Sequence, residues 1–344
     1  MKKKILQISI GLALSVLFAY LAVKDIKWQD IFSTLQQDKD WWYLVPASAL
    51  FMASFIFRAW RWHYFLQPVK SLRFHPLFSA IMVGYMGNNV LPIRLGEILR
   101  AYALNRSSNV SKSAGLATVV VERLVDTIGL LVFFLIAVLF ASLPSQYQSV
   151  ITLTSILAIG LLVFLIGITF FEAFTKKILN RIFGLLPEFV SEKLQSITDA
   201  FLDGLAGLRQ TQNYWKILAH TLIIWSLFAA STFYMLKAFR FDTVYSMTFV
   251  SGIVVFLIGT VGVMIPSSPG YVGTFHYAIV QALALFGVPN EPALGFAIVI
   301  HLMNYLPVTG LGLFYFLREG LRFQDVSKAA EGTKPTNVSD VYSP

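Results

Sequence analysis

The stretch AGLATVVVERLVDTIGLLVFFLIAVLFA, residues 114–141, decides the fold class. It is longer than the roughly 20 apolar residues with which a helix crosses the hydrocarbon core of a bilayer. Only Glu122, Arg123 and Asp126 place ionisable groups in it. We therefore expect a transmembrane helix that carries a small cluster of charges near its start.

The composition of the whole chain agrees with a membrane protein. Hydrophobic residues make up 56% of the 344 residues and charged residues only 13%, about half the share that is usual in soluble domains. This balance excludes an ordinary cytosolic enzyme. The chain has no cysteine, which removes disulfides, thiolate metal sites and cysteine nucleophiles from consideration.

Apolar runs of membrane length recur along the chain. Eight are long enough to cross, and they cover residues 5–23, 42–57, 114–141, 150–171, 217–236, 245–265, 272–288 and 293–317. The first has no cleavage site and is read as an uncleaved helix. A ninth run, 77–91, is short and interrupted by glycine and asparagine, so we predict that it is re-entrant. The predicted fold class is an all-α polytopic integral membrane protein with about eight transmembrane helices plus a re-entrant, broken-helix segment.

The distribution of basic residues predicts the topology. The net charge is +9, and most of the 27 Lys and Arg residues fall in loops that this arrangement places on one side. By the positive-inside rule both termini are cytoplasmic, in a multi-pass protein of the cytoplasmic (inner) membrane. A full crossing by 77–91 would put the basic loop 176–216 outside, which favours the re-entrant reading. Outside the apolar runs, the sequence has no stripe of basic residues with interleaved aromatic residues, so we do not expect nucleic-acid binding.

Two further segments are read from their patterns. Residues 190–208 predict an amphipathic helix on the inner surface, either a plain connection between crossings or a regulatory element. From residue 324 the chain is polar and aperiodic. We thus expect a transmembrane domain over 1–323 and a disordered cytoplasmic tail over 324–344.

The first polar break reads NNVLPIRLGEILR, residues 88–100. Pro92 suits the first turn of a helix, and a helix that starts inside the membrane directs unpaired N–H groups and a positive dipole end at the space before it. Such a site suits a phosphate or carboxylate, and arginine can bind phosphate in bidentate fashion. The predicted lipid- or phosphate-binding residues are Asn88, Asn89, Arg94, Glu97 and Arg100. The alternative is a cytoplasmic helix start with surface ion pairs.

The second break is the intramembrane charge cluster Glu122, Arg123 and Asp126. Glu122 and Asp126 are four residues apart on one helix face, and Arg123 can pair with Asp126. Charges at this depth must face protein or a wet cavity, and residues of the first break are the expected partners. A structural salt bridge and a role in ligand or proton handling are both open.

The third break reads IPSSPGYVGTFHYAIVQ, residues 265–281. Serine can cap a helix, proline can open the next one, and glycine permits close backbone approach. Interrupted hydrophobic segments in both halves of a chain are typical of transporters with a site between broken helices. The predicted residues of this broken helix are Pro266, Ser267, Ser268, Pro269, Gly270 and Gly273.

The other polar positions in apolar runs favour structural roles. We read His276, Gln281, His301 and Asn304 as interhelical hydrogen-bonding groups and expect no metal and no cofactor. Four residues lie at the inner end of the second crossing: Arg58, Trp60, Arg61 and Trp62. We interpret them first as an anchor at the membrane interface and second as a contact for phosphate.

Three motifs in this order resemble one known family. They are N-x-x-x-P-x-R-x-G-E-x-x-R over 88–100, E-R-x-x-D over 122–126 and P-x-x-P-G-x-x-G over 266–273. The chain resembles the lysylphosphatidylglycerol synthase transmembrane-region family, also called flippase-like membrane proteins, from about residue 5 to 322. The resemblance implies an eight-helix domain linked to the movement of aminoacylated phosphatidylglycerol between leaflets. Stand-alone relatives are also linked to polyprenol- or dolichol-linked glycans. The acyltransferase-like domain of the larger synthases is not among these residues, so lysyl transfer is not expected.

Three functions follow as expectations. The leading one is a lipid flippase, and not an enzyme, that handles a phospholipid or polyprenyl-phosphate-linked lipid with an anionic or zwitterionic headgroup. In it Arg94 and Arg100 hold phosphate, and Arg123 locks the cavity wall. The second is a non-transporting membrane subunit that presents a lipid-linked substrate to a separate lipid-modifying enzyme, a glycosyl- or aminoacyl-transferase. Assembly as a homo-oligomer is open for either function. The third is an intramembrane enzyme, which is disfavoured because no nucleophile–base pair can be named. The sequence has no Walker-type ATP-binding motif, so a gradient or the lipid itself would drive movement.

Overall fold

A computed structural model provides the structure of the chain. It describes residues 13, 16–22, 39–91, 95–141, 144–170, 172–184, 191, 195, 213–265 and 267–322. Within these ranges every regular element is a helix and no strand occurs. The all-α membrane fold expected from the sequence is confirmed.

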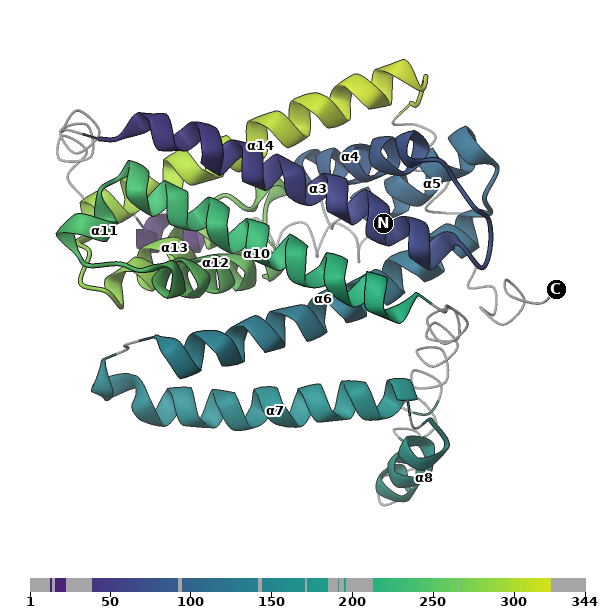
Figure 1. Cartoon of the computed structure of the whole chain (residues 1–344), viewed down its shortest axis with the longest axis horizontal. Coiled ribbons are helices and arrows are strands. Elements are labelled where there is room, and N and C mark those ends of the chain that lie inside the picture. Colours follow the sequence, from purple (N-terminus) through teal and green to yellow (C-terminus); the bar gives the residue numbers. More distant parts are fainter. Residues whose placement is uncertain are drawn as a thin grey trace.

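Within the described residues, five helical segments are long and apolar enough to cross a membrane. They lie along the long axis of the molecule and include α3 (Leu44–Leu66), α6 (Lys112–Phe140), α7 (Gln148–Phe170), α10 (Tyr214–Ala238) and α14 (Asn290–Arg318) (Figure 1). Short elements near the ends of the long helices are η1 (Trp41–Tyr43), η3 (Ser145–Tyr147), α8 (Glu172–Phe183) and α11 (Phe241–Val244). We name the two ends of the molecule after α11 and α5, which lie at opposite ends of the long axis.

A first helical hairpin is formed by α4 (Phe74–Val90) and α5 (Gly96–Ser108). With 17 and 13 residues, they measure about 26 and 20 Å at 1.5 Å per residue, less than the roughly 30 Å of a hydrocarbon core. The two helices pack backbone to backbone, since a methyl group built on Gly87 would lie 2.8 Å from Cα of Gly96. The run 77–91 is therefore followed by a short helix that returns beside it, as the broken-helix reading requires.

A second hairpin is formed by α12 (Phe249–Met264) and α13 (Thr274–Ala284), with η4 (Pro269–Tyr271) at its tip. The 11 residues of α13 span only about 16 Å. The helix starts after Gly273, whose φ of 92° only glycine adopts readily, and it ends before the turn at Gly287. The prediction that residues 272–288 cross as one helix is therefore wrong.

The two hairpins occupy opposite halves of the long axis, and their tips meet near its middle (Figure 1). A methyl group built on Gly270 would lie 3.6 Å from the carbonyl oxygen of Asn89. The side chain of Asn89 also donates to Thr309 Oγ1 on α14 at 2.8 Å. Two breaks that are far apart in the sequence thus form one central region.

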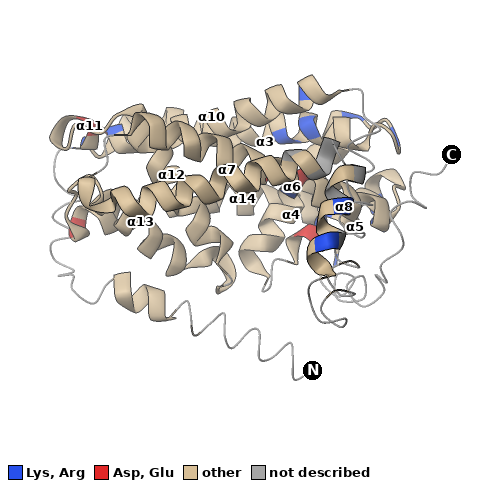
Figure 2. Cartoon of the chain, turned by 90° about the horizontal axis from the view of Figure 1, so that it is seen from below, with Lys and Arg blue, Asp and Glu red and all other residues tan. Residues whose placement is uncertain are grey.

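The surface of α7 suits contact with lipid. Only 11% of its apolar window is buried, although α7 packs against α6, and large apolar side chains such as Val150, Leu153 and Leu157 are exposed. Lys and Arg gather at the α5 end of the described chain (Figure 2). By the positive-inside rule we expect this end to be cytoplasmic.

Several predictions fall on parts of the chain that the structure does not describe. The first crossing (5–23) and the amphipathic helix (190–208) lie largely outside the described residues. The tail (324–344), Pro92, Arg94 and Pro266 lie wholly outside them.

Candidate functional site

Glu122 on α6 is the centre of a buried network of ion pairs. Its carboxylate accepts from Arg100 Nη2 at 2.7 Å, Arg123 Nη2 at 2.9 Å and Arg58 Nη1 at 3.2 Å. The Glu122 side chain is only 1% exposed. Three helices therefore hold their charges together here, since Arg58 lies on α3, Arg100 on α5 and Glu122 on α6. Trp62 of α3 also stacks against the Arg100 guanidinium, 3.7 Å from the ring centre.

Asp126, one helical turn further along α6, extends the network. Arg61 Nη2 donates to Asp126 Oδ1 at 2.7 Å, and Arg58 Nη1 donates to Oδ2 at 2.9 Å. Arg61 Nη1 also donates to Thr221 Oγ1 on α10 at 3.0 Å. The expected pair of Arg123 with Asp126 is present but longer, at 3.7 Å.

The role expected for the group at the end of α3 is wrong for most of its members. Arg58, Arg61 and Trp62 are buried, and only Trp60, which is 44% exposed, fits an interfacial anchor. The two arginines instead neutralise carboxylates of α6, because an unpaired charge inside the membrane is costly. The signal was in the sequence: Arg58 and Arg61 are three residues apart, which places both on the helix face that meets Glu122 and Asp126.

Glu97 and Arg123 are the charged side chains of the network that remain accessible. The Arg123 side chain is 41% exposed and the Glu97 side chain 35%, and their Nε and Oε1 atoms lie 3.8 Å apart. Arg100 is 3% exposed and held by Glu122. The expectation that Arg100 holds phosphate is therefore not supported, because its guanidinium is committed to a buried pair. Arg123, expected to lock the wall, is the accessible cation.

A cavity of about 610 Å³ lies beside the accessible part of the network, between the two hairpins. One part of its lining is charged or polar and consists of Arg58, Tyr85, Asn88, Asn89, Glu97, Arg123 and Asp126. The larger part is aromatic and aliphatic and includes Phe51, Phe55, Leu130, Phe228, Phe256, Val263, Met264, Phe275, Ile279 and Ile300. Met264 is 53% exposed, so the cavity reaches the surface near the end of α12. The cavity thus has an ionic end and an apolar body.

The residues of the second-half break support this cavity more than they line it. Ser267, Ser268, Pro269, Gly270 and Gly273 are not among its lining residues. Ser268 occupies the N-cap position of η4 without a capping hydrogen bond from its side chain, and Pro269 opens only this short turn. The lining comes instead from Tyr271 and Phe275, which are other residues of the same break, and from His301, Asn304 and Tyr305 of α14.

The two histidines of the last helices lie side by side. Nε2 of His276 and Nδ1 of His301 are 3.3 Å apart, which agrees with the expected interhelical hydrogen-bonding role. The sequence separation of 25 residues hid this pairing. Within the described ranges, no group of three or more His, Asp or Glu side chains is arranged to hold a metal ion.

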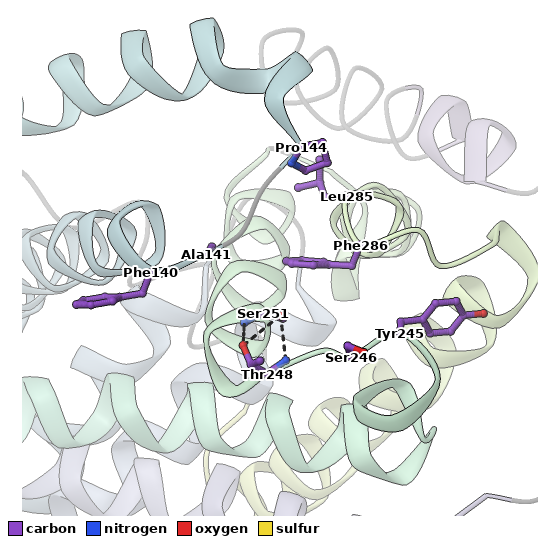
Figure 3. Close-up of a pocket in the computed structure, with 9 residues that line it drawn as sticks. All are labelled: Phe140, Ala141, Pro144, Tyr245, Ser246, Thr248, Ser251, Leu285 and Phe286. Atoms are coloured by element: carbon purple, nitrogen blue, oxygen red, sulfur yellow. Dashed lines mark hydrogen bonds between the residues drawn. The ribbon is translucent and has the colours of Figure 1, made fainter.

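A second pocket, of about 500 Å³, lies at the α11 end (Figure 3). Its lining has aromatic rings and hydroxyl groups but no charged side chain: Phe140, Ala141, Pro144, Tyr245, Ser246, Thr248, Ser251, Leu285 and Phe286. Thr248 and Ser251 satisfy each other in a capping box at the start of α12. The central cavity is therefore the one that combines charge with apolar surface.

Comparisons with known proteins agree with this architecture. The family model described as the lysylphosphatidylglycerol synthase TM region matches residues 8–312. The chain is 24% identical to a UPF0104 membrane protein of Methanocaldococcus jannaschii over 92% of its own length and 96% of the relative. It is also 24% identical to a UPF0104 membrane protein of Pyrococcus horikoshii, over 87% of its length and 91% of that relative. A further relative from Methanothermobacter thermautotrophicus is 24% identical over 80% of the chain and 83% of that protein.

Proposed function

The chain belongs to the lysylphosphatidylglycerol synthase transmembrane-region family, and on that premise we propose that it moves a phosphate-bearing lipid between the leaflets of the cytoplasmic membrane. The observation that carries the proposal is the central cavity, in which an ionic end adjoins a long apolar body. A lipid has the same division, since its headgroup is charged and its chains are apolar.

The balance of charge at the ionic end favours an anion. Within the described part of the chain, the guanidinium groups of Arg58, Arg61, Arg100 and Arg123 face the carboxylates of Glu97, Glu122 and Asp126. One positive charge is left over. The accessible cation is Arg123, whose planar fork of N–H donors matches the geometry of a phosphate. Glu97 beside it provides a place for a cationic or hydroxyl-bearing part of a headgroup.

The two hairpins supply a route to either side. We propose that α4–α5 enters the membrane from the cytoplasmic side and α12–α13 from the opposite side, so that each tip closes the cavity toward one leaflet. Discontinuous helices that meet near the midplane are the recurring site architecture of secondary transporters. A displacement of one tip at a time would expose the cavity to one leaflet and then to the other.

Leaflet-resolved assays in proteoliposomes test the proposal. Vesicles that contain the protein and fluorescent phosphatidylglycerol are treated with an impermeant quencher, which reaches lipid of the outer leaflet only. The expected result is quenching well beyond the outer-leaflet share, and Arg123→Gln should abolish the excess. Arg318→Gln is the matched control, because Arg318 is an exposed arginine near the end of α14, stacked on Phe314.

The same assay separates the alternative function. A subunit that only presents lipid to another enzyme would bind phosphatidylglycerol through Arg123 but leave the quenched fraction at the outer-leaflet share. If the excess quenching is present and Arg123→Gln leaves it unchanged, the cavity is not the route.

A further inference from the structure

A chain of hydrogen bonds ties the tip of the second hairpin to α14. The N–H of Gly273 donates to His276 Nδ1 at 3.4 Å. His276 Nε2 and His301 Nδ1 are 3.3 Å apart, and His301 also hydrogen-bonds to the backbone of Gly270. Both histidines are thus joined to the same tip, at its two positive-φ glycines.

This series of hydrogen bonds fixes the positions of the protons on both histidine rings. Because Gly273 donates, His276 Nδ1 must be an unprotonated acceptor, and the single proton of a neutral His276 sits on Nε2. That Nε2–H donates to His301 Nδ1, so the proton of His301 is on Nε2, from which it can donate to the Gly270 carbonyl. Every donor then has an acceptor, and this arrangement holds only while both rings are neutral.

A proton added to either histidine ring breaks this series of hydrogen bonds. A proton on His276 Nδ1 faces the Gly273 N–H, and a proton on His301 Nδ1 faces the Nε2–H of His276. Two donors then point at each other. The linked tip is also under backbone strain, since Tyr271 has a φ of 59° in addition to the two glycines. The loss of a link therefore weakens a conformation that other contacts must hold.

Apart from tyrosines, the described surroundings of the tip leave these histidines as its titratable pair. Tyr305 on α14 lies edge-on to His301, with ring centroids 5.7 Å apart, and Tyr271 is on η4 itself. α12, which packs against α13, has no ionisable side chain between Phe249 and Met264. The charged groups that line the same cavity are those of the ionic end: Arg58, Glu97, Arg123 and Asp126.

We propose that His276 and His301 form a proton-binding site whose protonation releases the tip of the α12–α13 hairpin and opens the central cavity. The site would couple cavity opening to pH. It goes beyond the proposed lipid movement and holds for any lipid that enters the cavity. Its test needs no transport measurement, so its failure and a failure of the proposed function can be told apart.

A cysteine reporter in this cysteine-free chain measures the opening. Thr260 lines the cavity, and its hydroxyl bonds only to the backbone of its own helix at Phe256, so Thr260→Cys is a mild change. The rate of labelling by a maleimide is measured between about pH 8 and pH 3.5, a range that extends below the one in which an exposed histidine changes charge. The rate is divided by that of the same cysteine in a His276→Gln, His301→Gln background, which removes the pH dependence of the thiol itself.

The expected ratio is near one at about pH 8 and rises by about fivefold toward about pH 3.5, as the loss of one hydrogen bond of ordinary net strength predicts. Glutamine can donate and accept in the places of each histidine but does not titrate, so the background protein should fold. His220→Gln is the matched control, since His220 lies on α10 outside the lining of the cavity and hydrogen-bonds to the Lys216 carbonyl of its own helix.

Two results would overturn the proposal. One is a ratio that stays flat over this range. The other is a pH response that His220→Gln removes. Should the double glutamine protein not fold, histidine NMR signals of the unchanged protein decide: titration of both rings together with a change at the Gly273 amide supports the site, and titration without that change refutes it.

Discussion

Glu122 offers the sharpest test of the buried network. Glu122→Gln removes the carboxylate that lies within 4 Å of four arginines and is the ion-pair partner of Arg100 within the described residues. Both members of the Arg100 pair are buried, at 3% and 1% exposure. Loss of one partner of such a pair costs about 3–5 kcal/mol, because an uncompensated charge stays behind. We expect Glu122→Gln to destabilise the protein by that amount.

The Arg100→Met variant and the double variant give the interaction energy between Glu122 and Arg100. Glu122 keeps three arginines in that variant, so the cost should be smaller, about 1.5–3 kcal/mol, the value of a hydrogen bond to a charged group. The double variant no longer holds a stranded guanidinium at position 100. It should therefore be more stable than the sum of the single losses predicts, by about 2 kcal/mol.

Equilibrium unfolding in mixed micelles, followed by circular dichroism, measures these free energies. The control is Arg240→Met at the α11 end, where the pair with Asp40 is 3.0 Å long but 45% and 36% exposed, so its loss should cost less than about 1 kcal/mol. Losses that add within about 0.5 kcal/mol in the double variant would mean that Glu122 and Arg100 do not interact as described.

Three further predictions use other parts of the fold. Gly96→Ala should separate α4 from α5 and lower stability by several kcal/mol, because the new methyl group would overlap the carbonyl of Gly84; an unchanged unfolding curve would contradict the hairpin packing. Burial raises the pKa of Glu319, so the folded state holds its proton more tightly and stability falls as pH rises from the unfolded pKa through the folded one. Glu319→Gln should flatten that part of the stability–pH curve measured by thermal unfolding, and a curve unchanged in slope would refute it. Single cysteines at Lys70 and Lys237 should be labelled by an impermeant reagent only from opposite sides of the membrane, and labelling of both from one side would overturn the topology.

Much of the fold could be predicted because the bilayer imposes a simple length rule. The long runs that became α3, α6, α7, α10 and α14 were recognised from their apolar length alone. The run 272–288 was not resolved correctly, since hydropathy counts apolar residues and ignores the backbone. The left-handed turn at Gly273 delays the helix, and the turn near Gly287 follows its end.

The candidate site was predicted in part. The two breaks and the cluster of Glu122, Arg123 and Asp126 were read as one polar region, and they do meet. The role predicted for Arg100 is not supported, because neighbouring positions on a helix face look alike in the sequence while burial depends on the partner helix. The role predicted for Arg123 in the cavity wall stays a prediction, and its pairs with Glu97 and Glu122 agree with it. The contributions of Arg58 and Arg61 were missed because an arginine at the end of a crossing more often reaches the interface.

Selective lipid binding tests the central claim most directly. The purified protein is titrated with phosphatidylglycerol and, separately, with a diacylglycerol of the same chains, and retained lipid is counted by native mass spectrometry. The account predicts that the phosphate-bearing lipid is retained in preference to diacylglycerol and that Arg123→Gln removes the preference while Arg318→Gln keeps it. Equal retention of both lipids by the unchanged protein, or a preference that survives Arg123→Gln, would contradict it.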